Sequence, residues 1–133
     1  MTWIADIEST IFSVVQARAK PKLQGNYPSI NFTTLQSVNK KPKFPNVYIH
    51  LLPMAELAED TEGVNINAVL ATFQIDVTSN TTQGDAKKVI YTIADILKEL
   101  RFNITTAPTF YIENDIYRGT MRVRRSIANK DIL

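Results

Sequence analysis

The residues best suited to chemistry lie near the C-terminus, where YRGTMRVRRSI (117–127) holds four arginines among eleven residues. The two-residue period of a β-strand places Arg118, Arg122 and Arg124 on one face and apolar side chains on the other. Arg125 falls on the apolar side, where we expect the chain to leave the sheet. Such a row of arginines can meet nucleic acid, a neighbouring subunit or only water.

Other residue types that support catalysis are sparse. His50 is the only histidine, cysteine is absent and the four glycines are scattered, so thiolate chemistry and a glycine-rich phosphate loop are excluded. A lone histidine on a strand is more often a hydrogen-bonded polar residue than a catalytic base. The carboxylates of ELAEDTE (56–62) lack the order of a calcium-binding loop. We therefore expect no enzymatic activity, no metal and no cofactor.

Length and composition favour one globular domain over residues 1–133, with 44% hydrophobic and 21% charged residues. No apolar run approaches the roughly 18 residues that span a bilayer. The N-terminus, MTWIADIEST, does not have the pattern of a secretory signal. We expect synthesis in the cytoplasm and no membrane partner.

The net charge of +2 is unevenly distributed. Residues 1–44 have a local net charge of +4, residues 45–85 contain no lysine or arginine and carry −6, and the remainder carries +4. Opposite patches on one chain can pair its copies head to tail. They can equally neutralise each other within one monomer.

The N-terminal half predicts a helix, a loop and a strand. Aliphatic residues at intervals of three and four indicate a helix over residues 3–19, and we expect Pro21 to end it. Residues 22–43 are expected to form a long cationic loop containing the strand-like run INFTTL. NVYIHLLP (46–53) alternates as a strand, and the acidic segment 53–67 is expected to be a second loop.

The C-terminal half has clearer patterns. AVLATFQIDVTSN (68–80) alternates apolar and polar residues, which is typical of a sheet buried on one side. A continuous apolar stripe predicts a helix over residues 85–101, preceded by Thr82 and Asp85 at the spacing of a helix cap. TFYIE (109–113), a turn at Asn114 and Asp115, and the arginine strand predict a hairpin.

These elements predict an α+β fold. We expect two layers, with a mainly antiparallel sheet of four to five strands and two helices packed on one face. The other face of the sheet should then carry the polar side chains of the alternating strands: Thr72, Gln74, Asp76, Arg118, Arg122 and Arg124.

The order of these segments resembles that of the tail terminator or tail completion proteins of long-tailed bacteriophages, also called minor tail or head-tail joining proteins. The resemblance rests on the N-terminal helix, FPNVYIHLLP, the acidic loop, ATFQIDVTSN, AKKVIYTIADILKEL and the final YRGTMRVRRSI. It covers nearly the whole chain, although the cationic excursion from Lys20 to Phe44 has no fixed counterpart.

The resemblance implies a virion protein of the tail or neck, assembled in the host cytoplasm. Proteins of this family form hexameric rings that cap the tail tube, so the implied partners are further copies of the chain, the tail tube protein and the head-tail connector. Passive contact with DNA in the channel is also implied.

Within such a ring, we expect the arginines to meet acidic residues of an adjacent subunit or to line the DNA channel. The residues expected at this interface or channel are Arg118, Arg122, Arg124, Arg125, Glu59, Asp60, Glu62 and Asp76. The expected partner-binding loops lie at 22–43 and 53–67, with Lys40, Lys41, Lys43 and Phe44 in or next to the first. The plainer alternative is a solvated sheet face partly neutralised by Asp76 of the same chain.

A small nucleic-acid-binding domain that uses Arg118, Arg122 and Arg124 is the second functional hypothesis. RGTMRVRR begins like the RNP1 strand of an RNA-recognition module. Thr120, Arg122 and Arg124 replace the aromatic residues that stack on bases in such modules. The low net charge is also weak for an autonomous DNA-binding domain.

Overall fold

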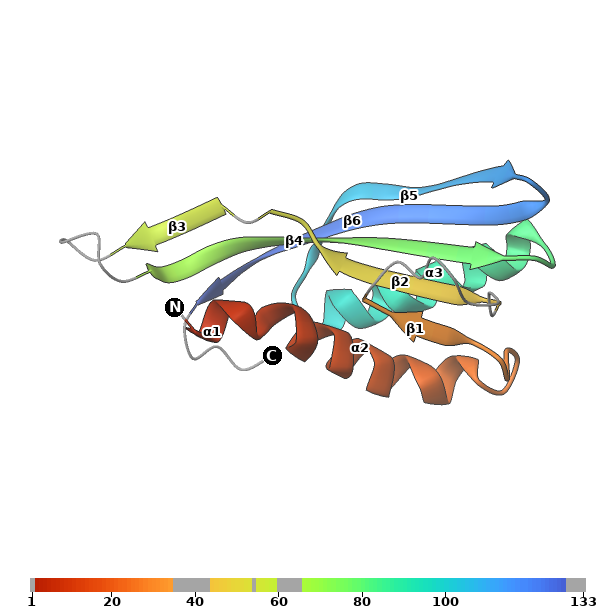
Figure 1. Ribbon diagram of the computed structural model, residues 1–133, viewed down its shortest axis with the longest axis horizontal. Helices are drawn as coiled ribbons and strands as arrows, with labels where there is room; N and C mark the ends of the chain where they lie inside the picture. Colours follow the sequence, from red (N-terminus) through yellow and green to blue (C-terminus); the bar gives the residue numbers. More distant parts are fainter. Residues whose placement is uncertain (1, 35–43, 54, 60–65, 129–133) are drawn as a thin grey trace.

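A six-stranded sheet and two long helices form the body of the protein (Figure 1). The structure is a computed structural model that describes residues 2–34, 44–53, 55–59 and 66–128. In chain order the elements are α1 (Thr2–Ala5), α2 (Ile7–Leu23), β1 (Asn31–Thr33), β2 (Asn46–Leu51), β3 (Ala55–Glu59), β4 (Ile66–Ser79), α3 (Gln83–Glu99), β5 (Asn103–Glu113) and β6 (Ile116–Ala128).

The sheet has the strand order β1-β2-β4-β6-β5, with β3 also paired to β4. The β1–β2 pair is parallel and the other pairs are antiparallel. The predicted α+β class with a mainly antiparallel sheet is therefore confirmed. The sheet has one strand more than expected because part of the acidic segment forms β3.

The core consists of the apolar side of the central strands and the apolar stripes of the helices. Its fully buried residues include Val47, Ile49, Val69, Ala71, Phe73, Ile75, Val77, Met121, Val123 and Ile127 from β2, β4 and β6. The side chains that alternate with them are half-buried or exposed. The helix α3 packs against β4, β5, β6 and α2. The two-residue period of the sequence thus determines which side of these strands is buried.

The helix α3 follows its predicted pattern. It begins two residues earlier than expected, and Thr82 caps it by accepting a hydrogen bond from the Asp85 backbone N–H at 3.1 Å. The predicted apolar stripe is buried, together with Ile96.

The helix α2 does not end before Pro21, contrary to prediction, but continues to Leu23. Its buried residues recur every four positions: Ile7, Ile11, Val15, Ala19 and Leu23. A proline removes one backbone hydrogen bond and crowds the carbonyl four residues earlier. Burial of Leu23 in the final turn offsets that cost, and the Gln24 N–H still donates to the Lys20 carbonyl at 2.8 Å. Glu8, near the start of α2, accepts a hydrogen bond from the Leu51 N–H at 2.7 Å and so ties the helix to the end of β2.

Both expected loops contain regular structure. Lys22 and Leu23 of the predicted 22–43 loop are helical, and residues 31–33 form β1 beside β2. The predicted 53–67 loop contributes β3 and the start of β4, which pair as an antiparallel hairpin. Figure 1 shows β3 and the first part of β4 extending beyond the helices at one end of the molecule. Charged residues lower strand propensity, and the composition of this acidic segment therefore predicts a loop rather than a strand.

The terminal hairpin is confirmed and is longer than expected. Asn114 and Asp115 have φ values of 51° and 62°, as required of both central residues in a two-residue type I′ turn. The strand β5 begins at Asn103 rather than Thr109. The strand β6 runs through Arg125 to Ala128, so the prediction that the chain leaves the sheet at Arg125 is wrong.

Within the described ranges, no helix combines the length and the apolar character needed to cross a bilayer.

The burial of Leu23 yields a direct test of how far α2 extends. We expect Leu23→Ala to lower the free energy of unfolding by about 2 to 5 kcal/mol, because it leaves a cavity in the core. The neighbouring exposed residue supplies a matched control, since Lys22→Ala should change it by less than about 0.5 kcal/mol. Urea unfolding measures both, and equal effects of the two substitutions would contradict a helix that continues past Pro21.

Candidate functional site

The polar face of the sheet brings three of the predicted arginines together. The β4–β6 register places Arg118 opposite Thr78, Arg122 opposite Gln74 and Arg124 opposite Thr72. Directly opposed residues of an antiparallel pair share a face. We call this surface, formed by Tyr48, His50, Thr72, Gln74, Asp76, Arg118, Thr120, Arg122 and Arg124, the arginine face.

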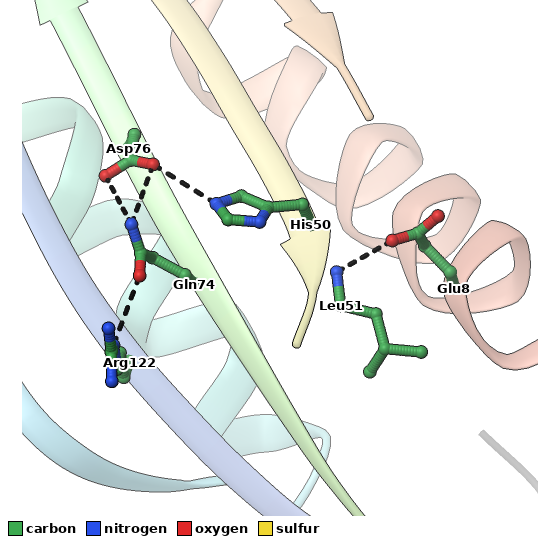
Figure 2. A network of polar contacts seen from close by, with 6 residues as sticks. All are labelled: Glu8, His50, Leu51, Gln74, Asp76 and Arg122. Carbon is green, nitrogen blue, oxygen red and sulfur yellow. Dashed lines mark hydrogen bonds and ion pairs between the residues drawn. The ribbon is translucent and has the colours of Figure 1, made fainter. Parts of the chain in front are cut away.

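A chain of hydrogen bonds crosses the arginine face from β2 to β6 (Figure 2). His50 Nε2 lies 3.3 Å from Asp76 Oδ2, and Gln74 Nε2 donates to Asp76 Oδ2 at 3.1 Å and to Oδ1 at 3.3 Å. Arg122 Nε donates to Gln74 Oε1 at 3.1 Å. Gln74 therefore connects the cation of β6 to the carboxylate of β4, which do not touch each other directly.

His50 is held from two sides. Its ring stacks on that of Tyr48, with centroids 4.3 Å apart and planes 15° apart. The contact with Asp76 becomes an ion pair when the imidazole is protonated, and the side chains of His50 and Asp76 are 21% and 31% exposed. Both groups therefore remain accessible to solvent, and His50 serves as a positioned polar residue on this surface.

The three arginines differ in their neutralisation. Arg118 Nε lies 3.7 Å from Glu113 Oε2, beyond hydrogen-bond distance, and both side chains are more than one-third exposed. Such a surface pair contributes little stability. Arg122 and Arg124 are exposed, and no described residue forms an ion pair with either of them. The arginine face therefore presents Arg122 and Arg124 to solvent without an ion-pair partner among the described residues.

Arg125 does not belong to this face. It lies opposite Ala71 on the apolar side of the sheet and is only 7% exposed. The structure therefore does not bring it together with the other three arginines, because the alternation that exposes Arg122 and Arg124 turns Arg125 toward the core.

Of the four acidic candidates, the two that the structure describes do not gather at the arginines. Glu59 is the last residue of β3 and pairs with Ile66, whereas Arg124 pairs with Thr72; six residues along β4 correspond to about 20 Å. Glu59 is thus apart from Arg124 along the sheet. Asp76 lies on the arginine face but is engaged by His50 and Gln74. Asp60 and Glu62 lie outside the described residues.

Among the predicted loop residues, Lys40, Lys41 and Lys43 lie outside the described residues. Phe44 is half-buried, and its carbonyl accepts a hydrogen bond from the Ser29 hydroxyl at 2.9 Å. It lines a hollow of about 590 Å³ at the end of the sheet where α3 begins, together with Tyr27, Ser79 and Asp85. The sequence did not indicate this hollow, because its walls come from four separate segments.

A small polar cluster closes one side of the hollow. The Tyr27 hydroxyl donates to Asp85 Oδ1 at 2.9 Å, and the Thr81 hydroxyl donates to Asp85 Oδ2. Burial raises the pKa of Tyr27, and the hydrogen bond and charge of Asp85 raise it further. The hydrogen bonds from Thr81 and then Tyr27 lower the pKa of Asp85. This cluster joins the turn after α2 to the start of α3, and its carboxylate is already occupied by donors, so we interpret it as structural.

The chemistry available on the arginine face is recognition of negative charge. Guanidinium groups on a rigid sheet bind carboxylates or phosphates by charge-assisted hydrogen bonds. Within the part of the chain that the structure describes, no three histidine, aspartate or glutamate residues are grouped so as to hold a metal ion.

Alternation along the strands predicted the members of the arginine face but not their partners. The positions of His50, Gln74 and Asp76 on polar strand faces follow from the sequence, whereas the link from Arg122 to Gln74 depends on the register of two strands 48 residues apart. No local signal in the sequence specifies that register.

Comparison with known proteins adds no family to these observations: no family model matches the chain, and no curated protein sequence is significantly similar to it.

The role of Gln74 as the link across the face can be tested by removing its amide. We expect Gln74→Met, which keeps the length of the side chain, to lower the free energy of unfolding by about 0.5 to 1.5 kcal/mol, since hydrogen bonds to Asp76 and Arg122 are lost. Thr72→Val on the same strand and face is the control, because no hydrogen bond of its side chain supports the network. Thermal or urea unfolding in which both variants behave alike would count against the link.

The hydrogen bond between Tyr27 and Asp85 is expected to make the free energy of unfolding depend on pH. The lowered pKa of Asp85 stabilises the folded state at pH values above 3.8, the ordinary pKa of the group. This stabilisation is lost as the pH falls through the pKa of Asp85 in the folded state. The raised pKa of Tyr27 stabilises the folded state at pH values below 10.0, the ordinary pKa of the group. This stabilisation is lost as the pH rises through the pKa of Tyr27 in the folded state. We expect Tyr27→Phe to cost about 0.5 to 1.5 kcal/mol at neutral pH and less at either extreme.

Urea unfolding of wild type and Tyr27→Phe across pH 3 to 11 would measure this window, with the exposed Tyr91→Phe as control. A cost that stays constant with pH would show that the hydrogen bond does not depend on the ionised carboxylate.

Proposed function

We propose that this chain is a structural virion assembly protein of a long-tailed bacteriophage, which forms a ring that caps the tail tube and joins the tail to the head. The observation that carries the proposal is the order of the elements. An N-terminal helix, the strand β2, an acidic projecting segment, the long strand β4, the helix α3 and the terminal arginine strand follow one another as in the tail terminator layout.

The distribution of charge supports assembly from copies of the same chain. The β3–β4 hairpin belongs to the segment 45–85, which contains no lysine or arginine, while β6 displays arginines on one face of the sheet. Glu59 pairs with a residue about 20 Å along β4 from the partner of Arg124, so these two residues are apart within one chain. A neighbouring copy in a closed ring brings unlike patches together.

In this assembly the partners are further copies of the chain, the tail tube protein and the head-tail connector. Arg118, Arg122 and Arg124 either meet acidic residues of the adjacent subunit or line the channel that DNA crosses. Both roles use the same property of the face, exposed guanidinium groups held at fixed spacing by β6.

Nucleic-acid binding by an isolated domain is the second candidate. Its supporting observation is the exposure of Arg122 and Arg124, whose guanidinium groups have no ion-pair partner among the described residues. It predicts a monomer whose affinity for DNA or RNA falls steeply with added salt.

Light scattering over a wide concentration range separates the two. The assembly proposal predicts a discrete mass near six copies of the 15.0 kDa chain, either alone or on addition of tail tubes. A strict monomer with salt-dependent nucleic-acid binding would favour the second candidate.

Charge reversal tests the arginine face directly. We expect the double variant Arg122→Glu and Arg124→Glu to fold as the wild type does but to lose ring formation or tail joining, because like charges then oppose the acidic partner or the DNA. The matched control is Lys20→Glu with Lys22→Glu, which makes the same change of charge at exposed positions of α2. A doubly reversed β6 that still gives rings and infectious particles would refute a role for this face.

A further inference from the structure

The exposed large apolar side chains of the described residues lie on β5 and on the part of α3 beside it. These are Tyr91, Tyr111 and Ile112, which are 50%, 51% and 58% exposed. Tyr111 lies opposite Arg118 and Ile112 opposite Tyr117, so their side chains project from opposite faces of the strand. Tyr91 of α3 lies beside Phe110 of β5, with ring centroids 6.3 Å apart. Apolar surface thus flanks the end of β5 on both faces.

This end of β5 is also suited to pair with another strand. Register shifts interrupt the first half of β5, which contains Pro108, whereas residues 109–113 pair regularly with β6. Proline residues, β-bulges and charged residues usually prevent an exposed sheet edge from pairing with a strand of another chain. Only the first half of β5 has the bulges and the proline, and Glu113 is the single charged residue in the second. Figure 1 shows β5 at the border of the sheet.

The strand β3 has complementary properties. It pairs on one side only, with β4, and has five residues, the same number as the regular part of β5. Its sequence, AELAE, carries two glutamates and lies in the segment without lysine or arginine. Cations flank the end of β5: Lys87 Nζ lies 5.4 Å from the centroid of the Phe110 ring, and Arg118 faces Tyr111.

The positions of β3 and β5 fit contact between different copies. In Figure 1, β3 lies at one end of the long axis and the turn after β5 lies at the other. The two strands therefore do not meet within one chain. A head-to-tail arrangement places the β3 end of one copy against the β5 end of the next, which is the geometry of a heterologous, ring-forming contact.

We propose that β3 of one copy adds to the outer edge of residues 109–113 in β5 of the next copy, so that the sheet continues from subunit to subunit. Backbone hydrogen bonds would supply the pairing, Tyr111 and Ile112 would cover the added strand on its two faces, and the acidic segment that contains β3 would lie on the side of Lys87 and Arg118. The inference deepens the proposed function, on which it rests for the existence of a ring, by assigning the contact between subunits.

The absence of cysteine in the chain permits a direct test by disulfide formation. Four variants each receive a single cysteine, in β3 at Glu56→Cys or Ala58→Cys and in β5 at Thr109→Cys or Tyr111→Cys. Each β3 variant is mixed with each β5 variant and oxidised. We expect covalent dimers in at least one such mixture and none when β5 variants are oxidised alone.

Each outcome decides the inference. Dimers between β5 variants alone would indicate two-fold pairing of equal edges and would overturn it. An oligomer without β3–β5 cross-links would overturn the proposed contact while leaving the ring function standing. A protein that stays monomeric and without cross-links even when tail tubes are added would overturn the contact as well. Cross-linked oligomers that fail to bind tail tubes would uphold the strand pairing and count against the tail function.

Substitution of the exposed apolar residues Tyr111 and Ile112 tests the contact independently, through its effect on self-association. We expect Tyr111→Lys with Ile112→Lys to weaken self-association at least about tenfold, measured by sedimentation, because buried aromatic and aliphatic anchors dominate such contacts. Ser13→Lys with Ala17→Lys adds the same two positive charges at exposed positions of α2 and should leave association unchanged. Circular dichroism verifies that all variants fold, and unchanged association of the β5 variant would contradict the inference.

Discussion

The antiparallel pairing of β4 with β6 is the constraint on which the rest of the structure depends. Residues 68–79 and 117–128 pair without interruption. This register sets Phe73 against Val123 and Ile75 against Met121 in the core, and Gln74 against Arg122 on the arginine face. A slip of one residue would turn the apolar side chains of β6 toward solvent and would bury Arg118, Arg122 and Arg124. Burial of the core face therefore fixes the position of the arginines on the other face.

The other elements extend this central pair in two directions. On one side β2 and β1 complete the sheet and bring Tyr48 and His50 next to Asp76. On the other, β5 is joined through a tight turn whose residues accept positive φ. The helix α3 packs on β4, β5 and β6, and α2 joins it through a line of buried residues four positions apart. The projecting β3–β4 hairpin continues β4 beyond this body.

The arginine face and the outer edge of β5 together offer polar and apolar groups to a partner. Guanidinium groups, a bridging amide and a stacked histidine provide directional polar groups on a rigid sheet. The apolar side chains at the end of β5 provide area that gains from being covered. These two surfaces adjoin at Arg118 and Tyr111, so one partner can engage charge and apolar area at the same time. This combination is consistent with the proposed ring.

Local patterns in the sequence determined the elements whose apolar period is unbroken. The alternation of β4 and β6, the stripe and cap of α3 and the Asn114–Asp115 turn each follow from interactions between residues close in the chain, so the α+β class and the membership of the arginine face could be predicted. Tertiary structure decided the remainder. The core contact of Leu23 carries α2 past Pro21, pairing with β4 makes a strand of the acidic segment 55–59, and continued pairing holds Arg125 in β6. In each case a long-range contact outweighs a local preference, because burial and strand pairing release more free energy than a proline or a glutamate costs.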